Sequence, residues 1–172
     1  MAQSYHYNFP TLFGEFMICW RIPDLVECIL LPKKGPPQNS LLKTNKVVQS
    51  LADQIKRYLA GDDVPFLLET LNLDKCSSFQ RKVLEAEYNI PRGYISTYGK
   101  IAQHIGIEGG ARAVGNALAK NPFPIVIPCH RAIRSDGTLG GYQGGIEMKR
   151  KLLEMEGVEF SGSRVKMNKV YY

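Results

Sequence analysis

The sequence lacks the features of several specialised classes of protein. Its 172 residues contain no apolar run approaching the roughly 20 residues that a membrane-spanning helix needs. The first six residues, MAQSYH, lack the basic start and apolar run of a secretory signal. Four cysteines without Cys-x-x-Cys spacing or a histidine at metal-finger spacing argue against a disulfide framework and a zinc finger. We therefore expect a soluble intracellular protein, cytoplasmic or, in a eukaryote, nuclear.

Positive charge is confined to the second part of an otherwise average globular composition. Residues 1–75 carry 8 Lys and Arg against 8 Asp and Glu, whereas residues 76–172 carry 14 against 8, which is the whole net charge of +6. A basic domain suits a polyanion such as nucleic acid. A solvated basic surface explains the same counts, and charge alone does not separate the two.

Residue patterns predict two domains, 1–75 and 76–172. In the first, Gly14–Trp20 and Leu25–Leu31 are expected strands, and the spacing of apolar residues over Lys46–Ala60 predicts a helix. In the second, helices are expected over 78–90, 98–104, 111–120 and 145–156. The basic tail, 161–172, receives no element and is expected to be a solvated extension, with phosphate contact by Arg164, Lys166 and Lys169 as the alternative.

The two short central helices form a helix-turn-helix pattern. Thr97 is a good N-cap for the first, and Gly106 stands where its C-terminal cap is expected. The second has a nearly bare face, made of Gly110, Ala111, Ala113, Gly115 and Ala117. Arg112 is the one large polar residue on that face, whereas major-groove recognition helices usually carry several. Tight helix packing and close approach to a DNA minor groove both stay open.

The most informative segment is 121–131, NPFPIVIPCHR. Its prolines bracket an apolar run and predict a rigid, buried backbone. Cys129 follows this run directly and is itself followed by His130 and Arg131. Such neighbours favour the nucleophilic thiolate. A glycine-rich loop over 136–145 follows and would shape a pocket lined by Tyr142. A buried, inert cysteine is the more common alternative, and Cys19 and Cys28, in apolar strands, are expected to be of that kind.

The motif Pro128-Cys129-His130-Arg131 resembles the active-site motif of the O6-alkylguanine-DNA alkyltransferases, also called methylated-DNA–protein-cysteine methyltransferases. Further matching motifs, in the family's order, are Ser78–Gln80, Tyr94–Gly99, Arg112–Gly115 and Leu152–Gly157. Residues 1–75 resemble the family only loosely. The implied fold is α+β: a small ribonuclease-H-like α/β domain, then a mainly helical catalytic and DNA-binding domain with a helix-turn-helix.

The resemblance implies a role for each matching residue. Cys129 accepts the alkyl group, His130 acts as the base through a water, and Glu156 polarises the imidazole, an arrangement typical of activated thiols. Tyr98 protonates the guanine and helps rotate the nucleotide, and Asn121 organises the turn beside the site. The residues expected to contact DNA are Thr97, Ala111, Arg112, Ala113 and Gly115, with Arg112 filling the place of the flipped nucleotide. The base pocket is expected to contain Tyr142, Pro128 and Gly144.

The implied function is repair of duplex DNA by direct reversal. The alkyl group of O6-alkylguanine, and of O4-alkylthymine, would pass to Cys129 in one irreversible turnover, since a thioether has no leaving tendency. No cofactor is expected, because the damaged DNA is the donor, and no zinc, because residues 1–75 offer only Cys19, Cys28 and His6 as ligands. The expected partner is lesion-bearing double-stranded DNA, without a membrane, and the protein is expected to be a monomer.

Two other functions stay open at this point. A non-catalytic lesion-recognition protein would bind alkylated DNA without transfer, although the presence of Cys129 argues against it. A thiol hydrolase would use Cys129 and His130 on a small substrate, and Arg112 on a bare helix counts against that reading.

Overall fold

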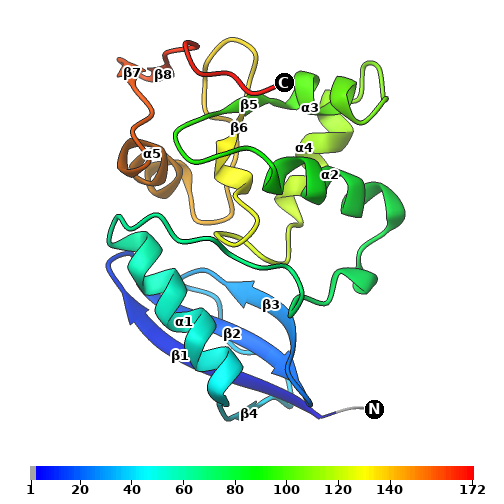
Figure 1. Ribbon diagram of the computed structural model, residues 1–172, viewed down its shortest axis with the longest axis vertical. Helices are drawn as coiled ribbons and strands as arrows, with labels where there is room; N and C mark the ends of the chain where they lie inside the picture. Colours follow the sequence, from blue (N-terminus) through cyan, green and yellow to red (C-terminus); the bar gives the residue numbers. More distant parts are fainter. Residues whose placement is uncertain (1–2) are drawn as a thin grey trace. The chain divides into compact units, whose positions relative to one another are not determined.

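The computed structural model describes residues 3–172 as a mixed α/β protein with five α-helices and three small sheets (Figure 1). The chain divides into two compact units. The first comprises the chain up to Lys75 together with Pro122–Val126, and the second comprises Cys76–Asn121 and Ile127–Tyr172. The short segment Pro122–Val126 thus belongs to the first unit and not, as its position in the sequence suggests, to the second. Among the described residues, no helix has both the length and the apolar character needed to cross a membrane.

A four-stranded sheet forms the first unit, in the order β3-β2-β1-β4. Strands β1 (Ser4–Thr11), β2 (Gly14–Arg21) and β3 (Leu25–Leu30) are antiparallel, and β4 (Leu41–Leu42) pairs parallel with β1. The two apolar strands, β2 and β3, match the prediction to within one residue at each end. Strand β1 was not predicted, although its aromatic residues alternate with polar ones, which is the pattern of a half-buried strand.

Helix α1 (Lys46–Leu59) lies along one face of this sheet (Figure 1). It begins after Asn45, whose side chain accepts a hydrogen bond from the Val48 amide at 2.8 Å. Its apolar stripe, including Val48 and Ile55, is buried in the same unit as Phe16 and Trp20 of β2. The helix predicted over 46–60 is therefore confirmed, and the sheet buries the face that the spacing indicated.

Helices dominate the second unit. They are α2 (Ser78–Tyr88), α3 (Tyr98–His104), α4 (Ala111–Ala119) and α5 (Ile146–Met155), with a short helical turn, η2 (Cys129–Arg131). The strand pairs are β5 (Ser96–Thr97) with β6 (Ala132–Ile133), parallel, and β7 (Phe160–Ser161) with β8 (Arg164–Val165), antiparallel. A second helical turn, η1 (Leu73–Lys75), ends the first unit. The α-helices lie within about two residues of their predicted ranges.

The turn between α3 and α4 depends on its glycines. The Thr97 hydroxyl caps α3 by accepting a hydrogen bond from the Lys100 amide at 3.2 Å. Gly106 then has a φ of +78°, a left-handed conformation that glycine adopts without penalty. At Gly110, which precedes α4, a Cβ atom would lie 2.7 Å from Cγ2 of Ile107. The sequence pattern at Thr97 and Gly106 therefore identified both helix ends.

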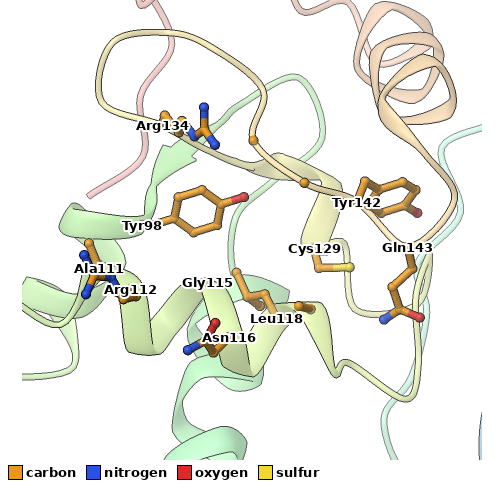
Figure 2. A pocket seen from close by; sticks show the side chains of 13 residues that line it. Tyr98, Ala111, Arg112, Gly115, Asn116, Leu118, Cys129, Arg134, Tyr142 and Gln143 are labelled. Atoms are coloured by element: carbon orange, nitrogen blue, oxygen red, sulfur yellow. The ribbon is translucent and has the colours of Figure 1, made fainter.

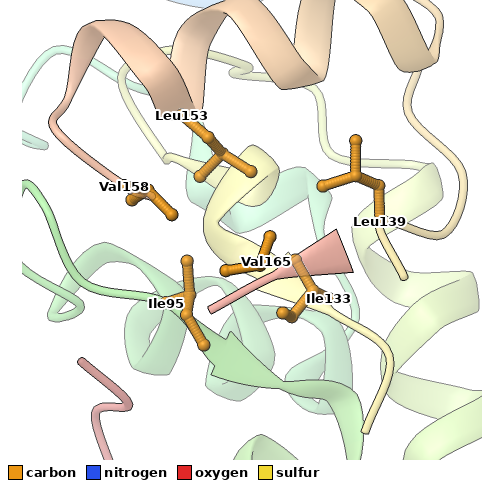
Figure 3. Packing of buried hydrophobic residues seen from close by; sticks show 6 residues of the cluster. All are labelled: Ile95, Ile133, Leu139, Leu153, Val158 and Val165. Carbon is orange, nitrogen blue, oxygen red and sulfur yellow. The ribbon is translucent and has the colours of Figure 1, made fainter. Parts of the chain in front are cut away.

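The C-terminal tail packs onto the second unit, so the expectation of a solvated extension was wrong. Val165 joins the buried cluster of Ile95, Ile133, Leu139, Leu153 and Val158 (Figure 3). Val170 bridges to Ile95, and the final residue, Tyr172, stacks on His104 with ring centroids 3.8 Å apart. The Tyr172 hydroxyl also donates a hydrogen bond to the Ala86 carbonyl at 2.8 Å. Scattered apolar residues separated by basic ones gave no periodic signal for this packing.

Candidate active site

Cys129 lies beside a cavity of about 710 Å³ in the second unit. The cysteine begins the helical turn η2 and is buried. Figure 2 shows its sulfur between Tyr98 and Tyr142 on one side and helix α4 on the other. Helix α4 contributes Ala111, Arg112, Gly115, Asn116, Leu118 and Ala119 to the lining, and the glycine-rich loop contributes Gly140, Gly141, Tyr142 and Gln143. Its volume is that of a site for a small organic group.

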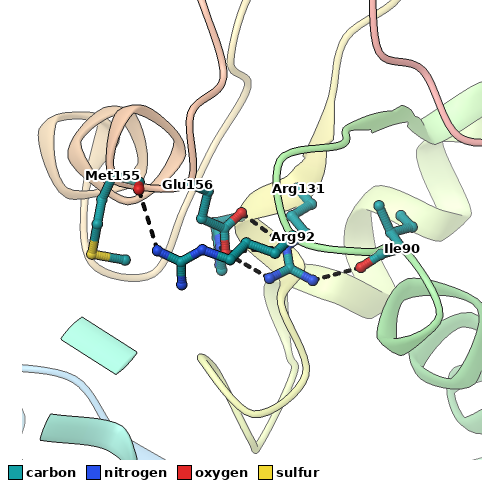
Figure 4. A network of polar contacts seen from close by, with 6 residues as sticks. Ile90, Arg92, Arg131, Met155 and Glu156 are labelled. Carbon is teal, nitrogen blue, oxygen red and sulfur yellow. Dashed lines mark hydrogen bonds and ion pairs between the residues drawn. The ribbon is translucent and has the colours of Figure 1, made fainter. Parts of the chain in front are cut away.

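A buried carboxylate, Glu156, organises the residues after Cys129. Its Oε1 lies 3.1 Å from Nε2 of His130. Arg131 donates to the same carboxylate from two nitrogens, Nη2 to Oε1 at 2.6 Å and Nε to Oε2 at 2.9 Å (Figure 4). Arg92 donates to the Met155 carbonyl at 3.3 Å nearby. The two hydrogen bonds from Arg131 fix the orientation of Glu156, and Glu156 in turn fixes the plane of the His130 imidazole.

The charge state of this network follows from burial and pairing. Burial alone would raise the pKa of Glu156, but its interactions with His130 and with the charged Arg131 outweigh burial and hold that pKa well below its usual range. Burial lowers the pKa of His130, and the attraction of Glu156 opposes this only in part. An ionised carboxylate only accepts, so Nε2 of the neutral imidazole carries the proton. Nδ1 is then the basic nitrogen.

The thiol of Cys129 is protonated in this environment. Burial raises its pKa to about 11, although a hydrogen bond from the Asn121 side chain and the charge of Lys149 lower it. The expectation that the adjacent cation and imidazole favour the thiolate was therefore wrong. His130 is neutral and Arg131 is neutralised by Glu156, so burial of the sulfur decides the outcome. A base must consequently remove the proton as the sulfur attacks.

Tyr98, the first residue of α3, is held by a buried lysine. Burial raises the pKa of Tyr98 to about 12, so its hydroxyl is a proton donor. Nζ of Lys149, a residue that is 0% exposed, lies 3.4 Å from that hydroxyl. The same Nζ donates to the carbonyls of Ala132 at 2.6 Å and Leu139 at 2.5 Å. Lys149 therefore links the glycine-rich loop and β6 to Tyr98, which lines the cavity.

The loop approaches Tyr98 closely at Gly140. A Cβ at this position would lie 2.8 Å from the Tyr98 hydroxyl oxygen, and its φ is +70°. Glycine is therefore required here both for the backbone conformation and for the close approach.

The structure brings together most of the residues that the sequence singled out. Tyr98, Cys129, Tyr142 and the α4 residues Ala111, Arg112 and Gly115 all line the cavity, and His130 and Glu156 form the network behind it. Arg112 and Ala113 are exposed on α4. Asn121 is buried and donates to the Ile127 carbonyl at 2.9 Å, so it bridges the turn before Cys129.

Three predicted site residues have a different placement. Thr97 is 5% exposed and its hydroxyl caps α3, which leaves it unsuited to a DNA contact. Pro128 is buried and Gly144 half-buried, and neither is among the described residues that line the cavity. Pro128 instead fixes the backbone that leads into η2.

Several residues of the site were not predicted from the sequence. Arg131 was part of the motif, but its pairing with Glu156 was missed because the two are far apart in sequence. Lys149 lies in the charged stretch EMKRK and gave the signal of an exposed helix residue. Gln143 donates to the Asn121 carbonyl at 2.8 Å, and its position next to Tyr142 was the only indication available. Within residues 3–172, no three His, Cys, Asp or Glu side chains are grouped so as to hold a metal ion.

This fold and site define a protein with a buried thiol, an imidazole–carboxylate pair behind it and an open cavity beside a bare helix. Residues 78–158 match the family model described as 6-O-methylguanine DNA methyltransferase, DNA binding domain. The methylated-DNA–protein-cysteine methyltransferase of Methanothermobacter thermautotrophicus is 49% identical over 115 residues, which cover 67% of this chain and 64% of that relative. The corresponding protein of Mycolicibacterium paratuberculosis is 41% identical over 144 residues, 83% of this chain and 86% of the relative.

Solved structures give the same result. The crystal structure of Mycobacterium tuberculosis OGT in complex with DNA matches with a TM-score of 0.77 at 33% identity and covers 88% of this chain and 92% of that one. The O6-methylguanine-DNA methyltransferase of Pyrococcus kodakaraensis matches with a TM-score of 0.67 at 26% identity, over 91% of this chain and 100% of that one. The chain belongs to the methylated-DNA–protein-cysteine methyltransferase family.

Proposed function

We propose that this protein repairs alkylated DNA by transferring the alkyl group of O6-alkylguanine in duplex DNA to Cys129, in one irreversible turnover. The observation that carries this proposal is the position of the Cys129 sulfur beside a cavity large enough for a base, between a tyrosine that donates a proton and the bare face of α4. The names of the relatives support the same activity.

The reaction requires two proton movements. The sulfur attacks the alkyl carbon, the S–C bond forms and the C–O6 bond breaks with its electron pair going to the guanine. His130, whose Nδ1 carries the lone pair, accepts the thiol proton through a water, and Glu156 stabilises the resulting imidazolium. Tyr98 gives a proton to the leaving guanine. The product thioether offers no route back to the thiol, so the protein is consumed.

The reacting carbon lies inside an intact duplex, so the nucleotide must be extruded. We assign α3 and α4 as a helix-turn-helix whose α4 enters the minor groove, because Ala111, Ala113 and Gly115 allow close backbone approach. Arg112, exposed and at the rim of the cavity, fills the vacated place in the stack. The first unit is proposed to be ribonuclease-H-like, and its strand order, β3-β2-β1-β4, with helix α1 on the sheet supports this. The protein is also proposed to be a monomer.

Intact mass spectrometry tests the proposed function directly. Mixed with duplex DNA that contains O6-methylguanine, the protein should gain about 14 Da on the peptide that holds Cys129. Cys129→Ala should bind the same duplex with little change in affinity but gain no mass, because the thiol acts only in the chemical step. Binding without a gain in the unaltered protein would identify a lesion-recognition protein. Turnover of small esters without DNA would identify a thiol hydrolase.

Arg112→Ala should slow alkyl transfer without removing the nucleophile. Because an inserted side chain offsets part of the cost of extruding a base, we expect the single-turnover rate to fall by about 10- to 100-fold. Lys120→Ala, at the other end of α4 and outside the cavity lining, removes the same charge and serves as the matched control. Rapid-quench assays on lesion-bearing duplex measure both rates, and equal rates in the two variants would exclude this role for Arg112.

A further inference from the structure

Two cysteines face each other across the sheet of the first unit. Cys19 of β2 and Cys28 of β3 are direct partners in the antiparallel ladder, immediately before an irregularity that shifts the register between Cys19 and Trp20. Directly opposed residues of antiparallel strands have Cα atoms about 4.5–5.5 Å apart, which falls within the range of about 4.4–6.8 Å that disulfides require. Both cysteines are free thiols in the structure. The register of the ladder therefore suits a cross-strand disulfide.

The two thiols are not equivalent. The interaction between the two side chains, together with burial, raises the pKa of Cys19, and the same interaction lowers the pKa of Cys28. Cys19 is 2% exposed, whereas Cys28 is half-buried and within reach of solvent. The positive charges of Lys75 and Lys34 act on Cys28 in the same direction. Lys75 is held at this place by donating to the Glu27 carbonyl at 2.9 Å.

We propose that Cys19 and Cys28 form a reversible oxidation site, at which a hydroperoxide oxidises Cys28 and Cys19 then closes a cross-strand disulfide. The evidence is the register of the ladder and the pairing of an accessible cysteine, on which two lysines act, with a buried partner. These are the properties that distinguish redox-sensing cysteine pairs from inert buried ones.

Hydrogen peroxide is the one oxidant that this reaction needs. The Cys28 thiolate attacks one peroxide oxygen, an S–O bond forms, the O–O bond breaks, and the leaving hydroxide takes up a proton to give water. Cys19 then attacks the sulfenic sulfur, an S–S bond forms, the S–O bond breaks, and a second water leaves with the Cys19 proton. Two thiols and one hydrogen peroxide thus give one disulfide and two waters, and a dithiol reductant reverses the change.

The full-length protein tests this proposal after titration with hydrogen peroxide and denaturation in N-ethylmaleimide. The four thiols of the reduced protein should fall to two at low peroxide, with a mass loss of about 2 Da before labelling. Trypsin cleaves after Arg21 and Lys33, so the oxidised protein should yield residues 1–21 linked to 22–33, and reduction should separate them. Oxidation that appears first at Cys76 or Cys129 would overturn the proposal.

Single variants separate the two roles. In Cys19→Ser, oxidation of Cys28 should stop at the sulfenic acid, which a 1,3-dione traps. Cys19→Ala replaces this variant if a buried hydroxyl impairs folding. In Cys28→Ser, Cys19 should react with peroxide more slowly than Cys28 does in the unaltered protein. Cys76→Ser is the matched control, since Cys76 is also half-buried, and it should form the disulfide as the unaltered protein does. Equal reactivity of Cys19 and Cys28 in the two single variants would contradict the assignment.

Discussion

Glu156→Gln should lower the single-turnover rate of alkyl transfer by about 10²- to 10⁴-fold and the free energy of unfolding by about 3–5 kcal/mol. The loss of stability arises because Arg131, buried beside Glu156, keeps its charge and loses the carboxylate that neutralises it. Replacing a carboxylate by an amide changes the shape of the side chain very little, so the effect isolates charge and hydrogen bonding.

The loss of rate arises from the imidazole. Both oxygens of Glu156 accept from Arg131, and Oε1 also faces Nε2 of His130, so an amide at position 156 must turn its NH₂ group toward a nitrogen of Arg131 in either orientation. An amide carries no charge, so the imidazolium that forms when His130 accepts the thiol proton loses the negative partner that stabilises it. Proton transfer to Nδ1 of His130, the step that the proposed mechanism uses, therefore becomes less favourable.

A matched control for Glu156→Gln lies two residues earlier in the chain. Glu154→Gln makes the same chemical change in a half-exposed side chain that pairs with Arg150 at i,i+4. It should alter the free energy of unfolding by less than about 1 kcal/mol and leave the transfer rate unchanged. Urea unfolding followed by far-ultraviolet circular dichroism, together with rapid-quench kinetics, measures both quantities. Similar values for the two variants would show that the buried network has no special role.

Prediction from the sequence succeeded where a local pattern was sufficient. The spacing of apolar residues over 46–60 and the cap at Thr97 depend on neighbours in the chain, and both match the structure. The C-terminal tail was missed because its order depends on partners far away in the sequence, such as Ile95 for Val170. Strand β1 pairs with β2 through a short turn, and it was missed although its alternating residues are a local strand signal. The motif at Cys129 likewise identified the position of the site.

Electrostatics could not be predicted in the same way. Adjacency in sequence suggested that His130 and Arg131 act on the Cys129 thiol, whereas in the structure both face Glu156. Lys149 looked like a solvated residue, yet it is buried under Tyr98. In both cases the sequence shows which charges are present, but only the fold shows which of them are paired and how much water remains.

Glu87 of helix α2 is a buried carboxyl group that the proposed reaction does not use. It is 0% exposed, and within the described residues its carboxyl group has no hydrogen bond of good geometry, although the backbone of Ala132 interacts with it weakly. Burial raises its pKa to about 8, although the charges of Lys149 and Arg131 oppose the shift. The side chain is therefore neutral in the folded protein at pH 7, and when it ionises it raises the pKa of Tyr98 and Cys129.

Glu87→Gln should make the protein more stable than the unaltered chain at neutral and alkaline pH. In the unfolded chain Glu87 ionises near its ordinary pKa of 4.5, whereas in the folded protein it stays protonated up to about pH 8. Between these values the unfolded state binds fewer protons than the folded state, so rising pH destabilises the unaltered protein by about 1.4 kcal/mol per unit from this group. Glutamine does not titrate. The advantage of the variant should therefore grow from pH 5 to pH 8, to the order of 3–5 kcal/mol, and then level off.

Two further variants show that this effect belongs to the buried carboxyl. Glu85→Gln, on the same helix, changes a half-exposed glutamate that pairs with Arg81, and its effect should stay below about 1 kcal/mol at every pH. Glu87→Leu removes the unpaired polar atoms as well, so it should exceed Glu87→Gln in stability even at pH 5, where the carboxyl is largely neutral in both states. Urea titrations at intervals of one pH unit measure these differences. A constant offset between Glu87→Gln and the unaltered protein would mean that the carboxyl titrates normally and that water reaches it.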